Sequence, residues 1–550
     1  MADPTTLADP TPLAGPPGAP TTAQAQIRGS SLLLVGRAMA MAVNFLVQIL
    51  TVRYLTKTDY GAFAYALSLV DVGQMIATFG LDRTVTRYLS MDDEHGHHDR
   101  LFGTLAFSVA VIAGLGFAVV VLVVGIQAAL PGGLVNDTHA ALLLTILILL
   151  APIQAFDALM TGVLSVFASP RSIFIRRFVL APGLKLAVIV LLVLGQAGVE
   201  FLAWGYVAAG LIGVLVYVVL LARLFSVRGL WSRLRPRQMD IPVRELLLFT
   251  VPLLTTDLVA IALNTSDAVL LGWFRGTADV AAFRVVIPAA GLNLLVFSSF
   301  SLLYMPAAAR LFARRDHEGV RDLYWQTAIW MAVISFPLFA ATFSLSGDVT
   351  RTLYGERYAS SAPYLAMLSL AYYFNTALGF NGLTLRVFGA VRTIVVINLA
   401  ATVLNIALNL VLIPLYGPLG AAIGTSTALI AHNILKQAGL RRTTGISLFD
   451  PRYARVYAVI AIGAILLLVV DVATSLGLAL EILLAAVVSA VVLGLTRREL
   501  RIGDTFPEVL RLPFARRVFG SKRDDGRGSG RDDRPDDGLG HDADVDPGDD

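Results

Sequence analysis

Long apolar runs are the feature that most constrains how this chain can fold. Stretches of about 20 apolar residues recur along most of its 550 residues, and each is long enough to cross the hydrocarbon core of a bilayer. Hydrophobic residues make up 56% of the chain and charged residues only 15%, whereas a soluble protein carries about a quarter charged residues. The sequence therefore predicts an all-α polytopic membrane protein that is surrounded by membrane lipids.

The predicted number of transmembrane helices is about 14. The fourth, eighth and tenth segments are long, and we expect them to tilt or to extend past the membrane. The predicted spans lie near residues 31–53, 60–80, 101–126, 139–168, 173–195, 200–222, 246–271, 280–309, 323–346, 361–385, 393–413, 418–438, 454–473 and 478–495.

Basic residues alternate between loops. The loops after even-numbered spans are rich in arginine, whereas those after odd-numbered spans carry few basic residues. By the positive-inside rule, this pattern predicts that both termini are cytoplasmic. It also favours 14 spans, because one missed helix would invert the pattern downstream. The loops at 127–138, 196–199, 414–417 and 474–477 carry no arginine or lysine.

Two pairs of similar segments indicate an internal duplication. LRVFGAVRTIV from Leu385 resembles LSVFASPRSIF from Leu164, 221 residues earlier. FRGTADVAAF from Phe274 resembles YLTKTDYGAF from Tyr54, 220 residues earlier. The common offset spans six helices, so it predicts two parallel six-helix repeats around a central cavity, followed by a C-terminal hairpin.

The duplication divides the chain into predicted parts. Composition predicts that both ends of the chain are disordered, because the first segment is rich in proline and the last in Asp, Gly and Arg. The predicted parts are a disordered segment 1–30, an N-lobe 31–224, a cytoplasmic linker 225–243, a C-lobe 244–440, a hairpin 441–496 and a largely disordered acidic cytoplasmic tail 497–550.

Polar and charged residues within the spans are the candidate site. A charge at that depth costs a few kcal/mol or more, so it should face a cavity or an opposite charge. Arginine suits phosphate because its planar fork donates two parallel hydrogen bonds. The alternative is that the basic residues pair with intramembrane aspartates and only fix helix packing. The candidate substrate-binding residues are Arg37, Asn44, Gln48, Lys185, Arg284 and Arg386, and the candidate ion-coupling residues are Asp71, Asp257 and Asp267.

Several function classes have no support in the sequence. The chain has no cysteine, which excludes disulfides, thiolate metal sites and cysteine catalysis. It also has no GxxxxGK[ST] motif, so a built-in ATPase is not expected. The cluster DDEHGHHD from Asp92 is better interpreted as a solvated loop than as a metal site, because no helical spacing orders its ligands. We expect no enzyme activity, no metal, no cofactor and no nucleic-acid partner.

The chain resembles a known family. RYLTKTDYGAFAYALSLV, FGLDRTVTRYLS and the later VFGAVRTIVVINLAATVLNIALNLVLIPLYGPLGAAIGTSTALI resemble segments of oligosaccharide flippases. These Wzx-like polysaccharide-biosynthesis exporters belong to the multidrug/oligosaccharidyl-lipid/polysaccharide superfamily. The resemblance spans about residues 30 to 440, and it implies two six-helix lobes around a cavity that moves a glycan linked to an isoprenoid (pyro)phosphate. Related peptidoglycan-precursor flippases place cavity arginines on the first and eighth spans, where Arg37 and Arg284 fall here.

The sequence therefore predicts a flippase for a lipid-linked oligosaccharide in the plasma membrane, which serves surface polysaccharide or glycoprotein assembly and associates with glycan-assembly enzymes. One alternative is a cation-coupled multidrug antiporter of the same fold, which would use poised acidic residues. A glycan polymerase or ligase is less favoured, because the longest external loops have only about a dozen residues and such enzymes need a large external region. A scaffold without transport activity is the last alternative.

Overall fold

The computed structural model describes residues 22–129, 138–167, 170–235, 237, 239–474 and 477–500. Most of the loop at 127–138 and nearly all of the predicted tail lie outside these residues. Within them the chain is nearly all helical and contains no strand, which confirms the predicted all-α class. The first helix begins at Thr22, inside the segment predicted to be disordered, and residues 1–21 are outside the described part.

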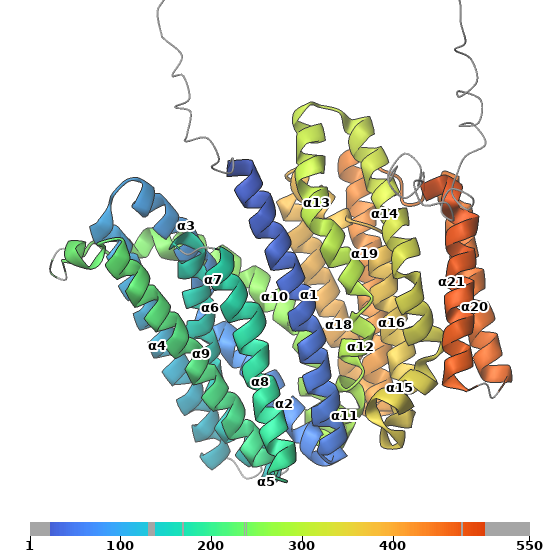
Figure 1. The fold of residues 1–550 in the computed structure, drawn as a ribbon, viewed down its shortest axis with the longest axis horizontal. Helices are drawn as coiled ribbons and strands as arrows, with labels where there is room; N and C mark the ends of the chain where they lie inside the picture. Colours follow the sequence, from blue (N-terminus) through green and yellow to red (C-terminus); the bar gives the residue numbers. More distant parts are fainter. Residues whose placement is uncertain are drawn as a thin grey trace, which may run out of the picture.

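The N-terminal half supplies one group of helices (Figure 1). The sixth and eighth helices are joined through a short helix and a turn of π-helix at Ile175–Leu180. The helices are α1 (Thr22–Tyr54), α2 (Lys57–Thr78), α3 (Leu81–Glu94), α4 (His98–Ala129), α5 (Thr138–Leu147), α6 (Leu150–Phe167), α7 (Pro170–Phe174), α8 (Ala181–Leu194) and α9 (Val199–Val227).

The C-terminal half supplies the second group, and α20 and α21 lie at its outer edge (Figure 1). The start of α1 and the end of α21 lie on the same side of the molecule. The helices are α10 (Val243–Arg275), α11 (Thr277–Arg284), α12 (Ile287–Gly291), α13 (Leu294–Ala313), α14 (His317–Phe339), α15 (Ser346–Tyr354), α16 (Ala362–Ala377), α17 (Asn381–Val387), α18 (Val391–Tyr416), α19 (Pro418–Thr444), α20 (Ala454–Ala473) and α21 (Leu478–Leu500).

The predicted number of spans is not confirmed. Among the described residues 11 helices are long and apolar enough to cross a membrane, or 12 if Thr277–Gly291 and Leu294–Ser301, bent by 45°, form one span. The predicted span 361–385 is divided into α16 and α17, with Gly379 at a φ of 79° in the break. The span 418–438 lies in α19, which buries polar residues such as His432 and Asn433. The mean hydropathy of α19 is low because the helix is surrounded by other helices, where polar side chains can be buried.

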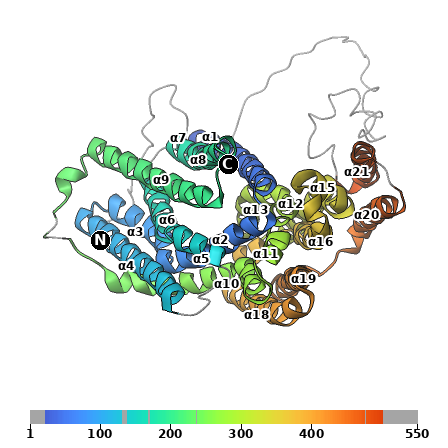
Figure 2. The same cartoon turned by 90° about the horizontal axis from the view of Figure 1, so that it is seen from below.

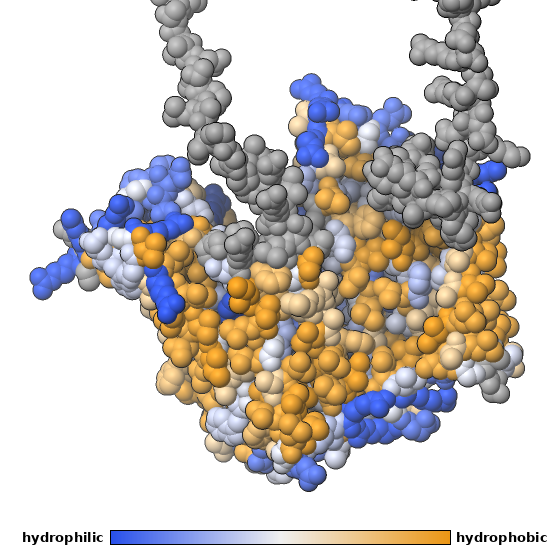
Figure 3. Space-filling model, viewed as in Figure 1, coloured by the Kyte–Doolittle hydropathy of each residue, from blue (hydrophilic) through white to orange (hydrophobic). Residues whose placement is uncertain are grey.

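The surface of the molecule has the distribution of hydrophobic and hydrophilic residues expected of a membrane protein (Figure 3). Hydrophobic side chains cover a broad band across the middle of the molecule, and hydrophilic ones gather at its upper edge and at the lower edge beneath α15. Exposed large apolar side chains occur on α4, α8, α9, α18, α20 and α21. An apolar surface of this extent is stable in lipid but not in water, so the chain is a multi-pass membrane protein.

One apolar cluster joins the two halves at the end opposite the termini. It combines buried side chains of α1 and α2 with those of α11, the 3₁₀ turn Glu356–Ser361 and α16. Helices α2 and α11 cross so closely that a Cβ at Gly61 would overlap the carbonyl oxygen of Thr277 and lie 3.2 Å from the Cβ of Ala281 (Figures 1 and 2). Gly61 and Ala281 are separated by the 220-residue offset of the sequence repeat, which is the contact expected next to an approximate two-fold axis. The lobe boundaries remain a prediction.

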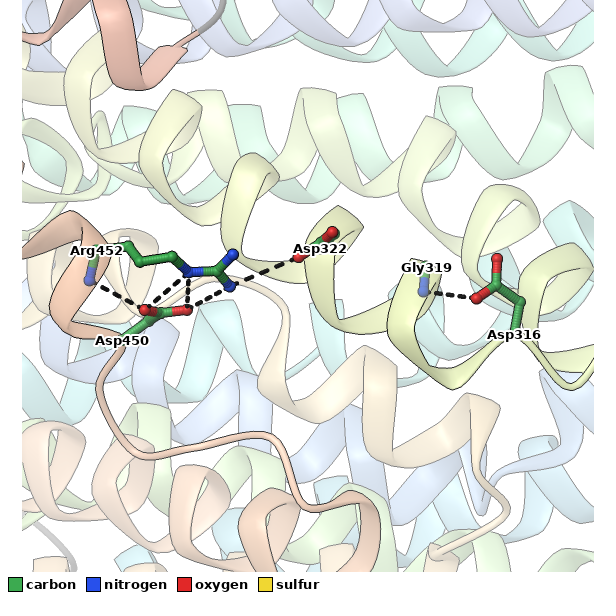
Figure 4. A network of polar contacts seen from close by, with 5 residues as sticks. All are labelled: Asp316, Gly319, Asp322, Asp450 and Arg452. Atoms are coloured by element: carbon green, nitrogen blue, oxygen red, sulfur yellow. Dashed lines mark hydrogen bonds and ion pairs between the residues drawn. The ribbon is translucent and has the colours of Figure 1, made fainter.

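A polar cluster holds the hairpin of α20 and α21 against α14 (Figure 4). Arg452 donates hydrogen bonds to the buried carboxylate of Asp450 at 2.7–3.2 Å, and its Nη2 lies 3.6 Å from Oδ1 of Asp322 at the start of α14. The hydrogen bond from Arg452 holds the pKa of Asp450 below its usual range. Asp316 caps the same helix by accepting a hydrogen bond from the backbone of Gly319 at 2.8 Å.

Candidate functional site

Three connected cavities cross the interior from one lobe to the other. The first, of about 790 Å³, lies among α2, α3, α6, α8 and α9, and the third, of about 800 Å³, lies among α10, α11, α16, α17, α18 and α19. A smaller cavity of about 370 Å³ lies between them. Arg83 lines all three, and Asp71 and Asp257 each line two, so together they form one polar space.

An ion pair between a buried arginine and a half-buried aspartate forms part of the wall of the N-lobe cavity. Arg176, from the π-helical turn, has a side chain only 6% exposed and is paired with Asp157 of α6. Its guanidinium lies 3.9 Å from the ring centroid of Tyr217. The tyrosine hydroxyl is 2.9 Å from Oγ1 of Thr161. Arg176 therefore has both a counter-charge and an aromatic platform, which matches the packing role that the sequence left open for such residues.

Lys185 and Asp71 face this same cavity from α8 and α2. The Lys185 ammonium lies 5.6 Å from the ring centroid of Tyr206, and Asp71 is close enough to interact with its charge. Two carboxamides, Gln74 and Gln154, complete this part of the wall. Two of the sequence-predicted residues are thus brought together here.

The junction between the cavities is an ion pair between the lobes. Arg83 Nη2 lies 2.9 Å from Oδ1 of Asp257, with side chains 53% and 20% exposed. Asp257 was a candidate ion-coupling residue, and its carboxylate already has an arginine partner. Arg83 is not among the sequence candidates, because the predicted second span ends at residue 80 and leaves this arginine in a loop. The helix in fact resumes at Leu81 after a break at Phe79 and Gly80, both with positive φ.

Arg284 lies where α11 meets α2. Its Nη2 donates a hydrogen bond of 2.7 Å to Oγ of Ser68, and its charge interacts with Asp71 and Asp267. Asp267 is 3% exposed and accepts a hydrogen bond of 2.7 Å from the backbone of Ala268. Arg284 lines the C-lobe cavity, and its hydrogen bond to Ser68 links the two lobes.

The far wall of the C-lobe cavity is basic. Arg386 of α17 and Lys436 of α19 both line it, together with His432 one turn before the lysine. The ring Nε2 of His432 is 2.8 Å from Oδ1 of Asn398 on α18. Arg386 was predicted from the sequence and Lys436 was not, although its spacing of four from His432 places the two on one helical face.

The predicted face of α1 does not line these cavities. Arg37 is exposed on α1, and Asn44 is exposed and donates a hydrogen bond of 2.8 Å to the carbonyl of Ala40. Gln48 donates to the carbonyl of Val285 at 3.1 Å, which ties α1 to the other lobe at the closed end. The three residues lie on one face of α1 by their spacing. That face does not meet a single partner, because α1 packs against one lobe near its start and against the other lobe near its end.

Two arginines close the end opposite the termini, and we call Arg53 and Arg357 the arginine latch. Arg53, at the end of α1, donates to the carbonyls of Leu353 (2.9 Å) and Thr352 at the end of α15. Arg357 donates in return to the carbonyls of Arg53 (2.9 Å) and Val52. Each arginine thus meets the unpaired carbonyls and the negative end of the other lobe's helix. Both belong to the few basic residues on this arginine-poor side.

Metal binding has no support in the described part of the chain, where no group of three or more His, Cys, Asp or Glu side chains could hold an ion. In the DDEHGHHD loop, His95 and His97 stack with ring centroids 5.8 Å apart, and His98 contacts Arg233.

A helical membrane protein with two lobes around a polar cavity that is closed at one end has the architecture of a transporter. Comparison with known proteins gives the family. The model of the polysaccharide biosynthesis protein family matches residues 27–312, more than half of the chain, and the MatE model matches residues 252–411. The chain therefore belongs to the polysaccharide biosynthesis protein family, and the sequence resemblance is confirmed.

One curated protein and two solved structures are similar to this chain. An uncharacterized membrane protein of Methanocaldococcus jannaschii is 24% identical over 418 residues, covering 72% of this chain and 80% of that protein. The lipid II flippase MurJ in an inward closed conformation superposes with a TM-score of 0.66 at 14% identity, over 86% of this chain and 99% of MurJ. An inward-facing multidrug resistance MATE family transporter of the MOP superfamily gives 0.59 at 14% identity, over 74% and 95%. The fold is that of the MOP superfamily.

Proposed function

We propose that the protein is a flippase that moves an oligosaccharide linked to an isoprenoid (pyro)phosphate from the cytoplasmic to the external leaflet of the plasma membrane. The observation that carries this proposal is the connected polar space, which reaches both lobes and has more basic than acidic side chains in its walls. Its two large cavities are of the size that holds a small ligand or a few sugars.

The asymmetry of the molecule supports entry from the arginine-rich side. Arg83 on α3 and Arg177 beside α7 line the N-lobe cavity, and both elements lie on the side of the chain termini (Figure 1). The other end is closed by the arginine latch and the apolar cluster. With cytoplasmic termini, this arrangement is the inward-facing state of an alternating-access cycle. An anionic head would then be attracted from the cytoplasm, and an inside-negative potential favours its outward movement by about 2.3 kcal/mol per charge per 100 mV.

The N-lobe cavity is suited to sugar hydroxyls. Its wall offers carboxamide and hydroxyl groups, including Gln74, Gln154, Thr161 and Ser165, beside the ring of Tyr206. Such groups both donate and accept hydrogen bonds. We assign no catalytic step to them, and association with glycan-assembly enzymes would supply the substrate.

The antiporter alternative is supported by the MatE match over residues 252–411. It needs carboxylates free to bind a proton or a cation. In this structure Asp257 is paired with Arg83 at 2.9 Å and Asp267 is close to Arg284. Asp71 alone of the three candidates is exposed in the cavity, and it interacts with two cations. The carboxylates are therefore better suited to balancing the basic wall.

Gene deletion tests the proposal. The lipid-linked glycan should accumulate in the cytoplasmic leaflet of membranes from the deletion strain, and expression of the chain should restore the external pool. Purified protein in liposomes should then make a labelled lipid-linked oligosaccharide accessible to a glycosidase added outside. Unchanged leaflet distribution in the deletion strain, together with no activity in liposomes, contradicts the proposal.

A further inference from the structure

The C-lobe cavity contains two basic side chains that lie close together. Arg386 is exposed on α17, and Lys436 is half-buried on α19. The outer atoms of the lysine, from Cδ to Nζ, lie 3.7–3.8 Å from the place that a Cβ would take at Gly382, one turn before Arg386 on α17. The lysine side chain therefore crosses onto α17, and Arg386 is the charged group with which it interacts.

The carboxylates of the same cavity serve other cations. Asp257 lies 2.9 Å from Arg83, and Asp267 accepts from the backbone of Ala268 and interacts with Arg284. Across the described residues, no ion pair within 4.0 Å joins Arg386 or Lys436 to a carboxylate. The two cations thus form a part of the wall whose charge no carboxylate of the described residues balances within ion-pair distance.

Two like charges held together in a partly dehydrated wall repel each other, and an anion between them removes that cost. Arginine offers a planar two-donor fork and lysine a compact point charge, a combination that suits adjacent phosphate oxygens. The lysine lies eight residues before the end of α19 at Thr444, which is about 12 Å of helix. The pair is therefore near the arginine-rich mouth of the cavity, within reach of a head group that enters there.

We propose that Arg386 and Lys436 form the subsite for the diphosphate of the lipid-linked substrate, an inference that rests on the proposed flippase function. Arg284 is less suited to this role, because it already donates to Ser68 and has Asp71 and Asp267 as counter-charges. The polar wall of the N-lobe cavity is then left for the glycan. The substrate head spans both lobes, with its charge on one side and its sugars on the other.

Binding to the purified full-length protein tests the subsite, with farnesyl diphosphate as the probe and farnesol and inorganic pyrophosphate as comparisons. The variants are Arg386→Gln, Lys436→Gln and Arg284→Gln. Arg392→Gln is the matched control, because it removes one exposed positive charge from the start of α18 outside the cavity. Thermal unfolding of each variant shows whether it is folded.

We expect the wild type to bind farnesyl diphosphate more tightly than farnesol or pyrophosphate. Arg386→Gln and Lys436→Gln should each weaken that binding by about tenfold, as for the loss of one charge-assisted hydrogen bond. Arg284→Gln should weaken it less, and Arg392→Gln should leave it unchanged.

Each other outcome overturns a different step. Wild-type affinity in folded Arg386→Gln and Lys436→Gln variants overturns the subsite and leaves the flippase proposal standing. Equal wild-type affinity for farnesyl diphosphate and farnesol contradicts a phosphate-linked lipid substrate, and with it the proposed function. If pyrophosphate binds the wild type as tightly as farnesyl diphosphate does, and Arg386→Gln and Lys436→Gln lose that binding, the subsite is for a free diphosphate. That result overturns the assignment to a lipid.

Discussion

Removal of the arginine latch should open the end that it closes. The latch consists of four hydrogen bonds from Arg53 and Arg357 to main-chain carbonyls of the opposite lobe. Replacement of both arginines by alanine removes these bonds but leaves the apolar cluster beneath them in place. We therefore expect Arg53→Ala/Arg357→Ala to fold and to populate the opposite, externally open state more often.

The size of the effect follows from the exposure of the latch. Both arginine side chains are exposed, so each bond is assigned about 0.5 kcal/mol, the low end of the usual net range. The four bonds together then contribute about 2 kcal/mol, which corresponds to a shift of about thirtyfold in the ratio of the two states. Each single variant should give about half of that free energy.

The absence of cysteine makes the assay direct, because one introduced thiol is the only one in the chain. Asn375→Cys places it in the C-lobe cavity. Its rate of reaction with a membrane-impermeant thiol reagent, added outside intact cells, reports the externally open population. Ser360→Cys, exposed beside the latch, is the accessible control. The double latch variant should react much faster at position 375 and equally fast at position 360.

An unchanged rate at position 375 in the double variant would refute the argument that the latch holds this end closed. Rapid external labelling at position 375 in the unmodified background would also refute it, because the cavity would then already be open to that side. Slow labelling of Ser360→Cys would instead contradict the predicted orientation of the chain.

Three further predictions concern stability. Asp450→Asn should lower the free energy of unfolding by about 1–3 kcal/mol. Because Arg452 lowers the pKa of Asp450, this contribution is present at neutral pH and is lost as the pH falls below about 4. Unfolding of the detergent-solubilised protein, measured over a range of pH, checks both statements. Gly61→Leu should reduce the yield of folded protein, since a Cβ there overlaps a carbonyl of α11, whereas Gly114→Leu, with nothing within 4 Å, should not. Arg176→Ala should lower the free energy of unfolding by about 1.5–3 kcal/mol, because it removes the charge-assisted hydrogen bond that the buried arginine donates to the half-buried carboxylate of Asp157. Neutralising that carboxylate by Asp157→Asn should restore part of the melting temperature, and an unchanged melting temperature in Arg176→Ala would contradict a packing role.

The sequence predicted the class of the fold. Apolar runs are sufficient for this, because in lipid the length and hydropathy of a segment determine most of its structure. The same rule does not confirm the spans predicted in α16, α17 and α19. These helices lie among other helices, where a glycine break at Gly379 and a polar face with His432 are tolerated.

The site was predicted less well, for reasons of geometry. Helical spacing shows that Arg37 and Gln48 share a face of α1, but not what that face meets. Gly36 packs against Phe174 and Phe178 of the N-lobe, whereas Gln48 bonds to Val285 of the C-lobe. The neighbours of a helix that changes partners along its length depend on tertiary packing, which a single sequence does not contain.

The apolar cluster that joins the lobes also has a thermal consequence. It buries aromatic side chains from both halves, including Tyr60 and Tyr358, whose rings meet edge to face at 6.5 Å. If the cluster separates when the lobes rock apart, that step exposes apolar surface and carries a positive heat-capacity change. The free-energy difference between the two states is then a curved function of temperature. The Arrhenius plot of the transport rate should therefore be curved, although the transported molecule is the same at every temperature.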